Sequence, residues 1–166
     1  MMRNVLLAIL LASVSGISYA VCNTTITPTA PNSRYQLLNN ATEVKDLKTN
    51  LIWQRCSLGQ TWSGTSCTGT ATQYTWADAL KTAQSIGGSW RLPNIKELQS
   101  LVERACSAPA INEAIFSNTS SDAYWSSSMY PHDSDFVFIV NFKFGGDGNF
   151  YFKSGNYYVR LIRDSQ

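Results

Sequence analysis

The chain has 166 residues, a formal net charge of +2 and only 14% charged residues. That length is typical of one domain rather than several. A charge so close to neutral excludes the strongly basic surface that nucleic-acid binding requires, so we predict no nucleic-acid partner.

Residues 1–20 have the features of a signal peptide. Arg3 provides the positive charge, residues 5–14 form a short apolar run, and Ser18-Tyr19-Ala20 has the small-x-small pattern of a cleavage site. The apolar run is shorter than the about 20 residues that a membrane span needs. We therefore predict cleavage after Ala20, no membrane insertion after cleavage, and a periplasmic, secreted or cell-surface location.

The cysteines Cys22, Cys56, Cys67 and Cys106 all follow this segment. An even number of cysteines in an exported chain predicts disulfides, and sequence alone allows three pairings. The short polar loop between Cys56 and Cys67 favours that local pair, which leaves Cys22–Cys106. A zinc site is disfavoured because there is no CxxC spacing and the sequence has one histidine.

Residues 21–43 are rich in turn-forming residues and are predicted to form an N-terminal arm. Residues 44–53 predict two short strands around a turn at Thr49-Asn50, with Trp53 entering the core. Residues 57–73 are predicted to be an exposed loop.

Two helices are expected next. The first covers residues 75–86, where apolar residues recur at helical spacing and Asp78 follows Thr75 by three positions. The second runs from Asn94 to about Ala105, with Glu97 three positions after Asn94, which is the spacing of a capping box.

Trp90 and Arg91 stand between the two predicted helices, and we expect structural roles for both. Trp90 is predicted to be largely buried. Arg91 is predicted to bond carbonyl groups or a carboxylate of the C-terminal strands.

The C-terminal part predicts an antiparallel meander. Its strands are expected at residues 124–128, 136–142, 150–152 and 157–163, with a hairpin turn at 145–149. Strands followed by helices and then by further strands indicate an α+β domain over residues 44–166, with two helices packed on an antiparallel sheet.

Five segments of the sequence occur in the same order as similar motifs in a known family: DLKTNLIWQRC, YTWADAL, GGSWRLPNIKELQSLV, YWSSS and YYVRLIR. On these motifs, roughly residues 44 to 163 resemble the Lcl C-terminal domain family. The resemblance implies an exported bacterial domain with a C-type lectin-like fold. It also implies adhesion, because the family's namesake is a surface adhesin whose C-terminal domain is linked to glycosaminoglycan binding.

Hard oxygen ligands gather in the loops of the C-terminal part. Asp133, Asp135 and Asp147 are candidate calcium ligands. The wider candidate ligand-binding set adds aromatic and amide side chains and comprises Tyr130, Asp133, Asp135, Asn141, Asp147 and Asn149. Hairpin and turn chemistry explains the same residues without a ligand.

The sequence favours a non-enzymatic, lectin-like binding or adhesion module that recognises a glycan or a cell-surface protein. One alternative is a structural accessory of a surface appendage such as a pilus. The other is an enzyme that uses His132 with its acidic neighbours as a general base.

Overall fold

The computed structural model describes residues 20–145 and 149–165. These residues form a mixed α+β structure with two α-helices, small antiparallel sheets and two disulfides, which confirms the predicted class. The predicted signal peptide lies outside the described residues, apart from Ala20. No helix in the described ranges has the length and apolar content needed to cross a membrane.

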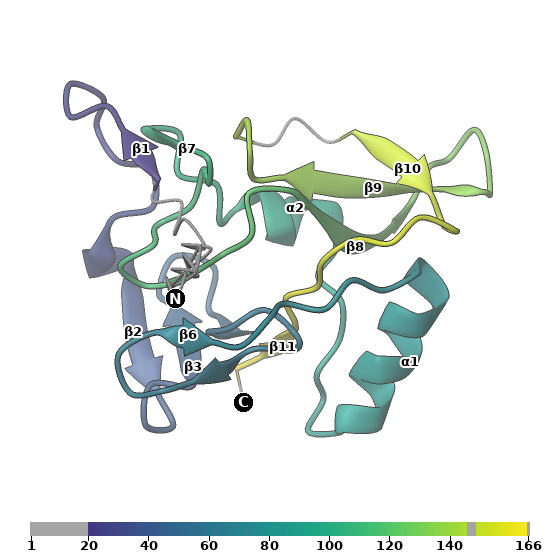
Figure 1. Cartoon of the computed structure of the whole chain (residues 1–166), viewed down its shortest axis with the longest axis horizontal. Coiled ribbons are helices and arrows are strands. Elements are labelled where there is room, and N and C mark those ends of the chain that lie inside the picture. Colours follow the sequence, from purple (N-terminus) through teal and green to yellow (C-terminus); the bar gives the residue numbers. More distant parts are fainter. Residues whose placement is uncertain (1–19, 146–148, 166) are drawn as a thin grey trace, which may run out of the picture.

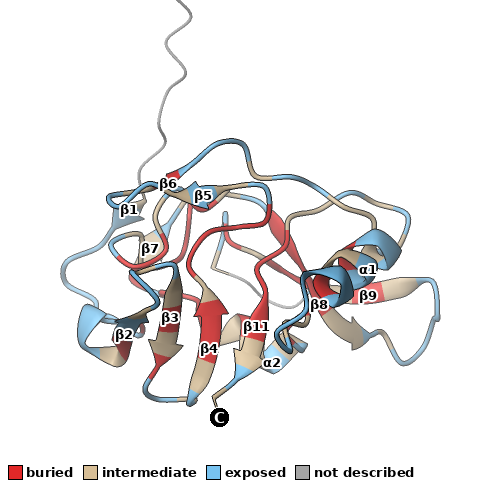
Figure 2. Ribbon diagram, turned by 90° about the horizontal axis from the view of Figure 1, so that it is seen from below, coloured by how far each residue is buried: buried red, intermediate tan, exposed pale blue. Residues whose placement is uncertain are grey.

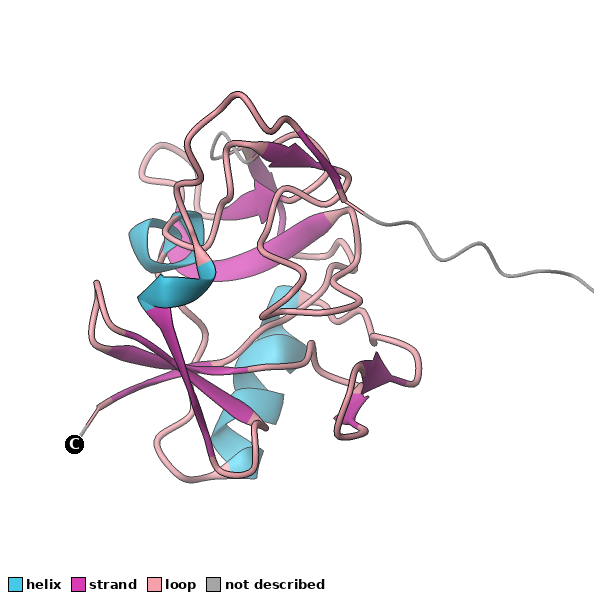
Figure 3. Ribbon diagram, turned by 90° about the vertical axis from the view of Figure 1, so that its left-hand side faces the viewer, coloured by secondary structure: helices cyan, strands magenta, loops and turns pink. Residues whose placement is uncertain are grey.

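Figure 1 shows the arrangement of the elements, and Figure 3 shows how much of the chain runs as loops between them. In chain order the elements are β1 (Val21–Cys22), the 3-10 helix η1 (Asn32–Arg34), β2 (Tyr35–Leu38), β3 (Glu43–Asp46), β4 (Leu51–Gln54), β5 (Thr61–Trp62), β6 (Cys67–Thr68), α1 (Trp76–Ile86), α2 (Ile95–Gln99), β7 (Cys106–Ser107), β8 (Ala123–Met129), β9 (Phe136–Asn141), β10 (Phe150–Phe152) and β11 (Ile162–Asp164).

One sheet has four strands in the order β11-β4-β3-β2. The hairpin β3–β4 is the pair of strands predicted in residues 44–53, and Asn50 in its turn has a φ of +58°, which asparagine tolerates better than most residues. β2 was predicted to be part of the arm but pairs with β3 along its whole length. The arm that lies outside the main sheets is therefore shorter than predicted.

A second sheet has three strands in the order β10-β9-β8. The prediction of a single meander is wrong at its last strand. Of the predicted residues 157–163, only the last two belong to a strand, and this strand, β11, pairs with β4 in the other sheet. The reason is long-range backbone bonding: Ile162 exchanges two hydrogen bonds with Arg91, and Tyr157 exchanges two with Tyr74.

Both helix starts were predicted correctly. The Thr75 side chain accepts a hydrogen bond from the Asp78 amide, and Asn94 and Glu97 form a complete capping box. Each bond satisfies an amide that the first helical turn leaves without a partner.

The predicted length of the second helix is wrong, because α2 ends at Gln99 rather than near Ala105. After it, the backbone of Val102 bridges to Ile111, and the buried Glu103 carboxylate accepts the amides of Thr29 and Ala30. These contacts with distant segments outweigh the local helical pattern.

The apolar core has two clusters that meet at the three-stranded sheet. In the first, the fully buried Trp53 packs with residues that follow α2, as predicted for this tryptophan. In the second, Ala79 and Ala83 of α1 pack against Trp125 of β8 and its neighbours. Figure 2 shows the buried inner parts of β3, β4, β11 and β8.

The disulfides are Cys22–Cys106 and Cys56–Cys67, the two pairs favoured by the sequence. The first joins β1 to β7, which also pair as strands. The second closes the hairpin β5–β6 onto the segment that follows β4. The loop predicted for residues 57–73 therefore contains a small sheet, and its Leu58 and Cys67 are buried.

Candidate functional site

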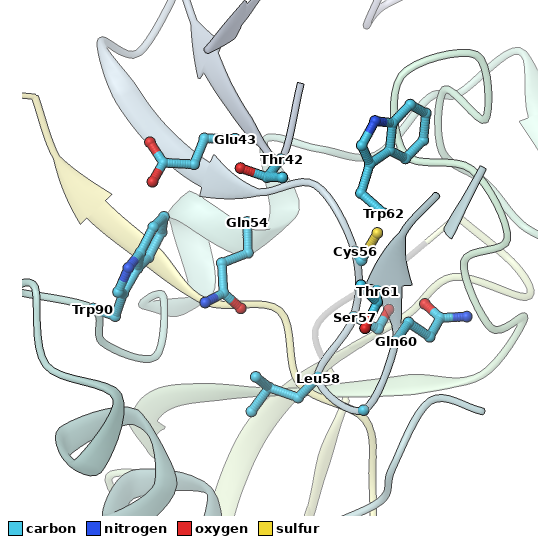
Figure 4. A pocket seen from close by; sticks show the side chains of 11 residues that line it. Thr42, Glu43, Gln54, Cys56, Ser57, Leu58, Gln60, Thr61, Trp62 and Trp90 are labelled. Carbon is cyan, nitrogen blue, oxygen red and sulfur yellow. The ribbon is translucent and has the colours of Figure 1, made fainter. Parts of the chain in front are cut away.

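A polar pocket of about 330 Å³ opens where β4, the following loop and the hairpin β5–β6 meet the segment between the helices. Figure 4 shows Trp90 on one side of this pocket, Trp62 on the other, and Gln54 between them. The two tryptophans lie 28 positions apart in the sequence and come from separate segments. Both indoles are half-buried, so each keeps a part of its ring available to a ligand.

The guanidinium of Arg55 packs over the ring of Trp62. The Arg55 guanidinium lies 3.5 Å from the centre of the Trp62 ring and donates to the carbonyl groups of Ile115, Ala41 and Ala114. Trp62 also pairs with Cys67 in the hairpin, and Cys67 is tied to Cys56 by the disulfide. The ring is therefore fixed by both a stacked cation and a covalent bridge, which reduces the entropy that ligand binding would cost.

Trp90 is held in a similar way on the opposite side. Its ring centre lies 5.3 Å from the guanidinium carbon of Arg163, and Arg163 donates a 2.8 Å hydrogen bond to the Glu43 carboxylate at the pocket wall. Trp90 has intermediate burial and packs against the second core cluster, which agrees with the prediction that it is largely buried. The part of the indole that stays exposed lines the pocket, beside Arg163.

Arg91, the residue beside it, has the predicted role. Its guanidinium donates to both carboxylate oxygens of Glu97, at 2.8 and 2.9 Å, and to Asp164 of β11 at 3.0 Å. This ion-pair network joins the start of α2 to the C-terminal strand and so positions the segment that carries Trp90.

The space between the tryptophans is bordered by amide and hydroxyl side chains. Gln54, Thr42 and Thr61 line it, together with Gln60. The Gln60 side-chain nitrogen donates to the carbonyl of Asn118 at 3.1 Å, whereas its buried oxygen has no hydrogen-bond partner among the described residues. An unpaired buried acceptor is costly.

The floor of the pocket depends on Arg160, which is fully buried. Its guanidinium donates to the carbonyls of Gln54 and Arg55 and to the hydroxyls of Ser57 and Thr119. Burial lowers the pKa of Arg160 from its ordinary value, and neutral oxygen partners take the place of water around it. Arg160 thus fixes the backbone that presents Gln54 and Ser57.

The structure distributes the predicted ligand-binding residues over separate parts of the three-stranded sheet. Tyr130 stacks on Phe150 with 4.1 Å between ring centres. Asp133 and Asp135 are exposed in the β8–β9 turn, where the Asp133 carboxylate accepts the Asp135 amide at 2.9 Å. Asn141 lies at the other end of β9, where its side-chain oxygen accepts the amide of Lys143 at 2.9 Å.

Asn149 is exposed, and its backbone carbonyl accepts the amide of Ile139. Asp147 lies outside the described residues. Among the residues that the structure describes, no three acidic, histidine or cysteine side chains form a group that could hold a metal ion. The calcium site therefore stays a prediction.

His132 is exposed in the same turn, with its ring centre 5.4 Å from that of Tyr130. Within residues 20–145 and 149–165, no hydrogen bond joins His132 to a carboxylate. The enzyme alternative stays a prediction that would need this histidine to act without an orienting partner.

The pocket was not predicted from the sequence. Ten of its eleven lining residues lie within residues 42–62, and Trp90 joins them from the segment between the helices, where the neighbouring Arg91 pairs with Ile162 of β11. One local signal was present. Trp62 is a large aromatic residue inside a loop rich in glycine, serine and threonine, and such a loop gives an indole little apolar material to pack against.

The model of the Lcl C-terminal domain family matches residues 42–163 of the chain. This range includes every element from β3 to β10 and most of β11, and it contains all the residues that line the pocket. A search of curated proteins finds no match.

Proposed function

The chain belongs to the Lcl C-terminal domain family, and from this membership and the pocket we propose that it is a non-enzymatic module that binds a glycan between Trp62 and Trp90. The two disulfides indicate an oxidising environment outside the cytoplasm, where surface glycans are found. The proposal includes the C-type lectin-like architecture that the resemblance implies. Its support is the mixed α+β class and the bridged loops.

One observation carries the proposal: two half-buried tryptophans line one pocket, and each is already held by an arginine. Sugar rings present apolar C–H faces and a rim of hydroxyl groups. An indole matches the first, and the amides of Gln54 and Gln60 match the second. Pockets in which a few polar groups fix the orientation of a ligand against aromatic walls are typical binding sites.

The pocket also suits a binding role better than catalysis. Its one carboxylate, that of Glu43, is paired with Arg163, and His132 does not line it. A general acid or base must reach the reacting atom with a proton to give or take, and paired Glu43 is poorly suited to that task.

A glycan array probed with oxidised protein tests the proposal. We expect binding to one class of saccharide, and we expect Trp62→Ala and Trp90→Ala each to weaken it by about tenfold or more, as for aromatic anchors of other interfaces. Phe144→Ala is the matched control, because Phe144 is 78% exposed and lies outside the pocket.

Binding that survives both tryptophan replacements would contradict the proposal. Loss of binding in Asp133→Ala or Asp135→Ala instead would move the site to the β8–β9 turn, where the sequence analysis placed it. The melting temperature of each variant shows whether the fold is intact.

A further inference from the structure

The outer edge of the three-stranded sheet is a second candidate interaction surface, separate from the pocket. Strand β10 is the end strand in the order β10-β9-β8. The opposite edge, β8, is covered, because Trp125 donates to the carbonyl of Tyr158 and Ser127 donates to that of Pro93.

The hydrogen bonds around β10 show which of its backbone groups face outward. Asn149 accepts from Ile139 at 2.8 Å, and Lys153 donates to Asp135 at 2.9 Å. In an antiparallel pair, bonded and non-bonded positions alternate, so Tyr151 is the bonded residue between them. Phe150 and Phe152 occupy the non-bonded positions opposite Phe138 and Phe136.

The hydrogen bonds that β9 makes on its other side, toward β8, agree with this alternation. The carbonyl of Phe136 accepts from the Tyr130 amide, and that of Phe138 accepts from the Ser126 hydroxyl. The backbone groups of Phe136 and Phe138 thus face β8. The backbone amides and carbonyls of Phe150 and Phe152 point outward from the edge of the sheet. Of these four outward groups, only the Phe152 carbonyl has a partner in the described residues, the amide of Gly155.

The side chains of the same two residues form an exposed aromatic face. Phe152 lies 4.0 Å from Phe136 between ring centres, and Phe150 stacks on Tyr130. Phe150 is 44% exposed and Phe152 is 58% exposed. An exposed apolar edge strand with unpaired backbone groups is a template for another strand, and monomeric proteins usually protect such edges.

The charges near Phe152, at the C-terminal end of β10, favour a partner with basic side chains. Asp133 and Asp135 are exposed in the adjoining turn, and neither has an ion-pair partner among the described residues. Lys153 is turned to the other side of the sheet, where its ammonium lies 4.6 Å from the centre of the Trp76 ring. The outer edge therefore combines apolar rings with an acidic end.

We propose that β10 takes up an extended segment of a partner protein, which adds a strand to this sheet. The segment carries apolar side chains at alternate positions, which lie on the aromatic face, and a lysine or arginine beside Asp133 and Asp135. Peptides bind exposed sheet edges in this way, with main-chain bonds for affinity and side chains for specificity. The added strand is antiparallel to β10, since that pairing is the more stable one.

The test uses a synthetic peptide of about six residues, the usual strand length. It has N-terminal lysines followed by alternating valine and threonine, which puts the lysines beside the acidic turn. One control peptide carries N-methyl groups on the alternate amides that would pair, and a second has glutamates in place of the lysines. Calorimetry measures the affinity of each peptide for the oxidised full chain.

Two protein variants isolate the backbone contribution. Phe150→Ala removes the ring and keeps the outward amide, whereas Phe150→Pro removes both. Because this amide is outside the β9–β10 ladder, proline is tolerated here as it is on other edge strands. We expect Phe150→Pro to bind the peptide about tenfold more weakly than Phe150→Ala, with both variants folded by circular dichroism.

We also expect Asp133→Asn with Asp135→Asn to remove the preference for lysine over glutamate. Equal binding of the methylated peptide, equal affinity of the two Phe150 variants, or no binding of the lysine peptide to wild type would each overturn the proposal. Dimerisation in sedimentation that Phe150→Pro abolishes would also overturn it, because the edge would then serve a second copy.

Discussion

Glu103 provides the sharpest test of how the N-terminal arm is held to the domain. One of its carboxylate oxygens accepts the amides of Thr29 and Ala105, both at 2.9 Å, and the other accepts the amide of Ala30 at 2.7 Å. Glu103→Gln can keep the first oxygen as an acceptor, but its NH₂ group then faces the Ala30 amide. One buried N–H is left without a partner, which costs about 1–3 kcal/mol.

Glu103→Ala leaves all three amides without their acceptor, and we expect a loss of about 3–5 kcal/mol, the range for breaking a buried charged network. For a domain of this size, about 1 kcal/mol corresponds to a few degrees in melting temperature. The assay is urea denaturation of oxidised protein at neutral pH. Equal stability of wild type and Glu103→Gln would refute the assignment of Glu103 as the anchor of the arm.

The same residue predicts a pH dependence. Burial raises the pKa of the Glu103 carboxyl, but hydrogen bonds from Ala105, Thr29 and Ala30 outweigh it and hold the pKa below its ordinary value. A lowered pKa in the folded state stabilises the protein above the unfolded value, near 4.3, and this stabilisation is lost as the pH falls through the folded value. The stability difference between wild type and Glu103→Gln should therefore be full at pH 7 and shrink below about pH 4. A difference that does not change with pH would contradict the account.

Three further predictions concern packing, covalent links and surface charge. Trp53→Ala should lower the free energy of unfolding by about 3–5 kcal/mol, because Trp53 is fully buried. Trp90→Ala should lower it clearly less, because Trp90 is half-buried. Thermal unfolding of the two variants measures the difference. Replacing Cys56 and Cys67 by serine should lower the free energy of unfolding by about 3 kcal/mol, because the bridge closes a loop with an 11-residue separation. Loss of the Cys22–Cys106 bridge should lower it more, because its separation is 84 residues. Urea denaturation measures both. Asp164→Asn should cost under about 1 kcal/mol, with a smaller effect at high salt, because the Asp164 carboxylate is largely exposed and Arg91 keeps its two bonds to Glu97.

The features that the sequence predicted well depend on neighbours close in the chain. Thr75 and Asn94 cap helices through bonds to residues three positions away, and Asn50 turns the β3–β4 hairpin. The short Cys56–Cys67 loop favoured its own disulfide. In each case the deciding interaction spans 11 positions or fewer, so that the local pattern contains it.

The features that it missed depend on contacts between distant segments. The spacing of Leu101, Val102 and Ala105 fits a helix, but Glu103 is occupied with arm residues more than 70 positions away. β11 could not be assigned to its sheet from its own residues. Its partner β4 lies about a hundred positions earlier, and the residues of a strand do not specify which distant strand it pairs with.

In the pocket, only Trp90 comes from a distant segment. Trp90 was predicted to be structural, and its place in the pocket wall depends on Arg163, a residue from a distant strand. From the sequence, the ligand-binding residues were predicted in the loops of the C-terminal part, from Tyr130 to Asn149. The structure puts an aromatic edge there and the polar pocket on the other sheet.

A crystal structure of the oxidised protein with the saccharide that binds best on the array tests the central claim most directly. The account predicts a sugar ring between Trp62 and Trp90, packed on at least one indole, with hydroxyl groups bonded to Gln54 and Gln60. A saccharide bound instead to the Tyr130–Asp135 turn, with the tryptophan pocket empty, would contradict it.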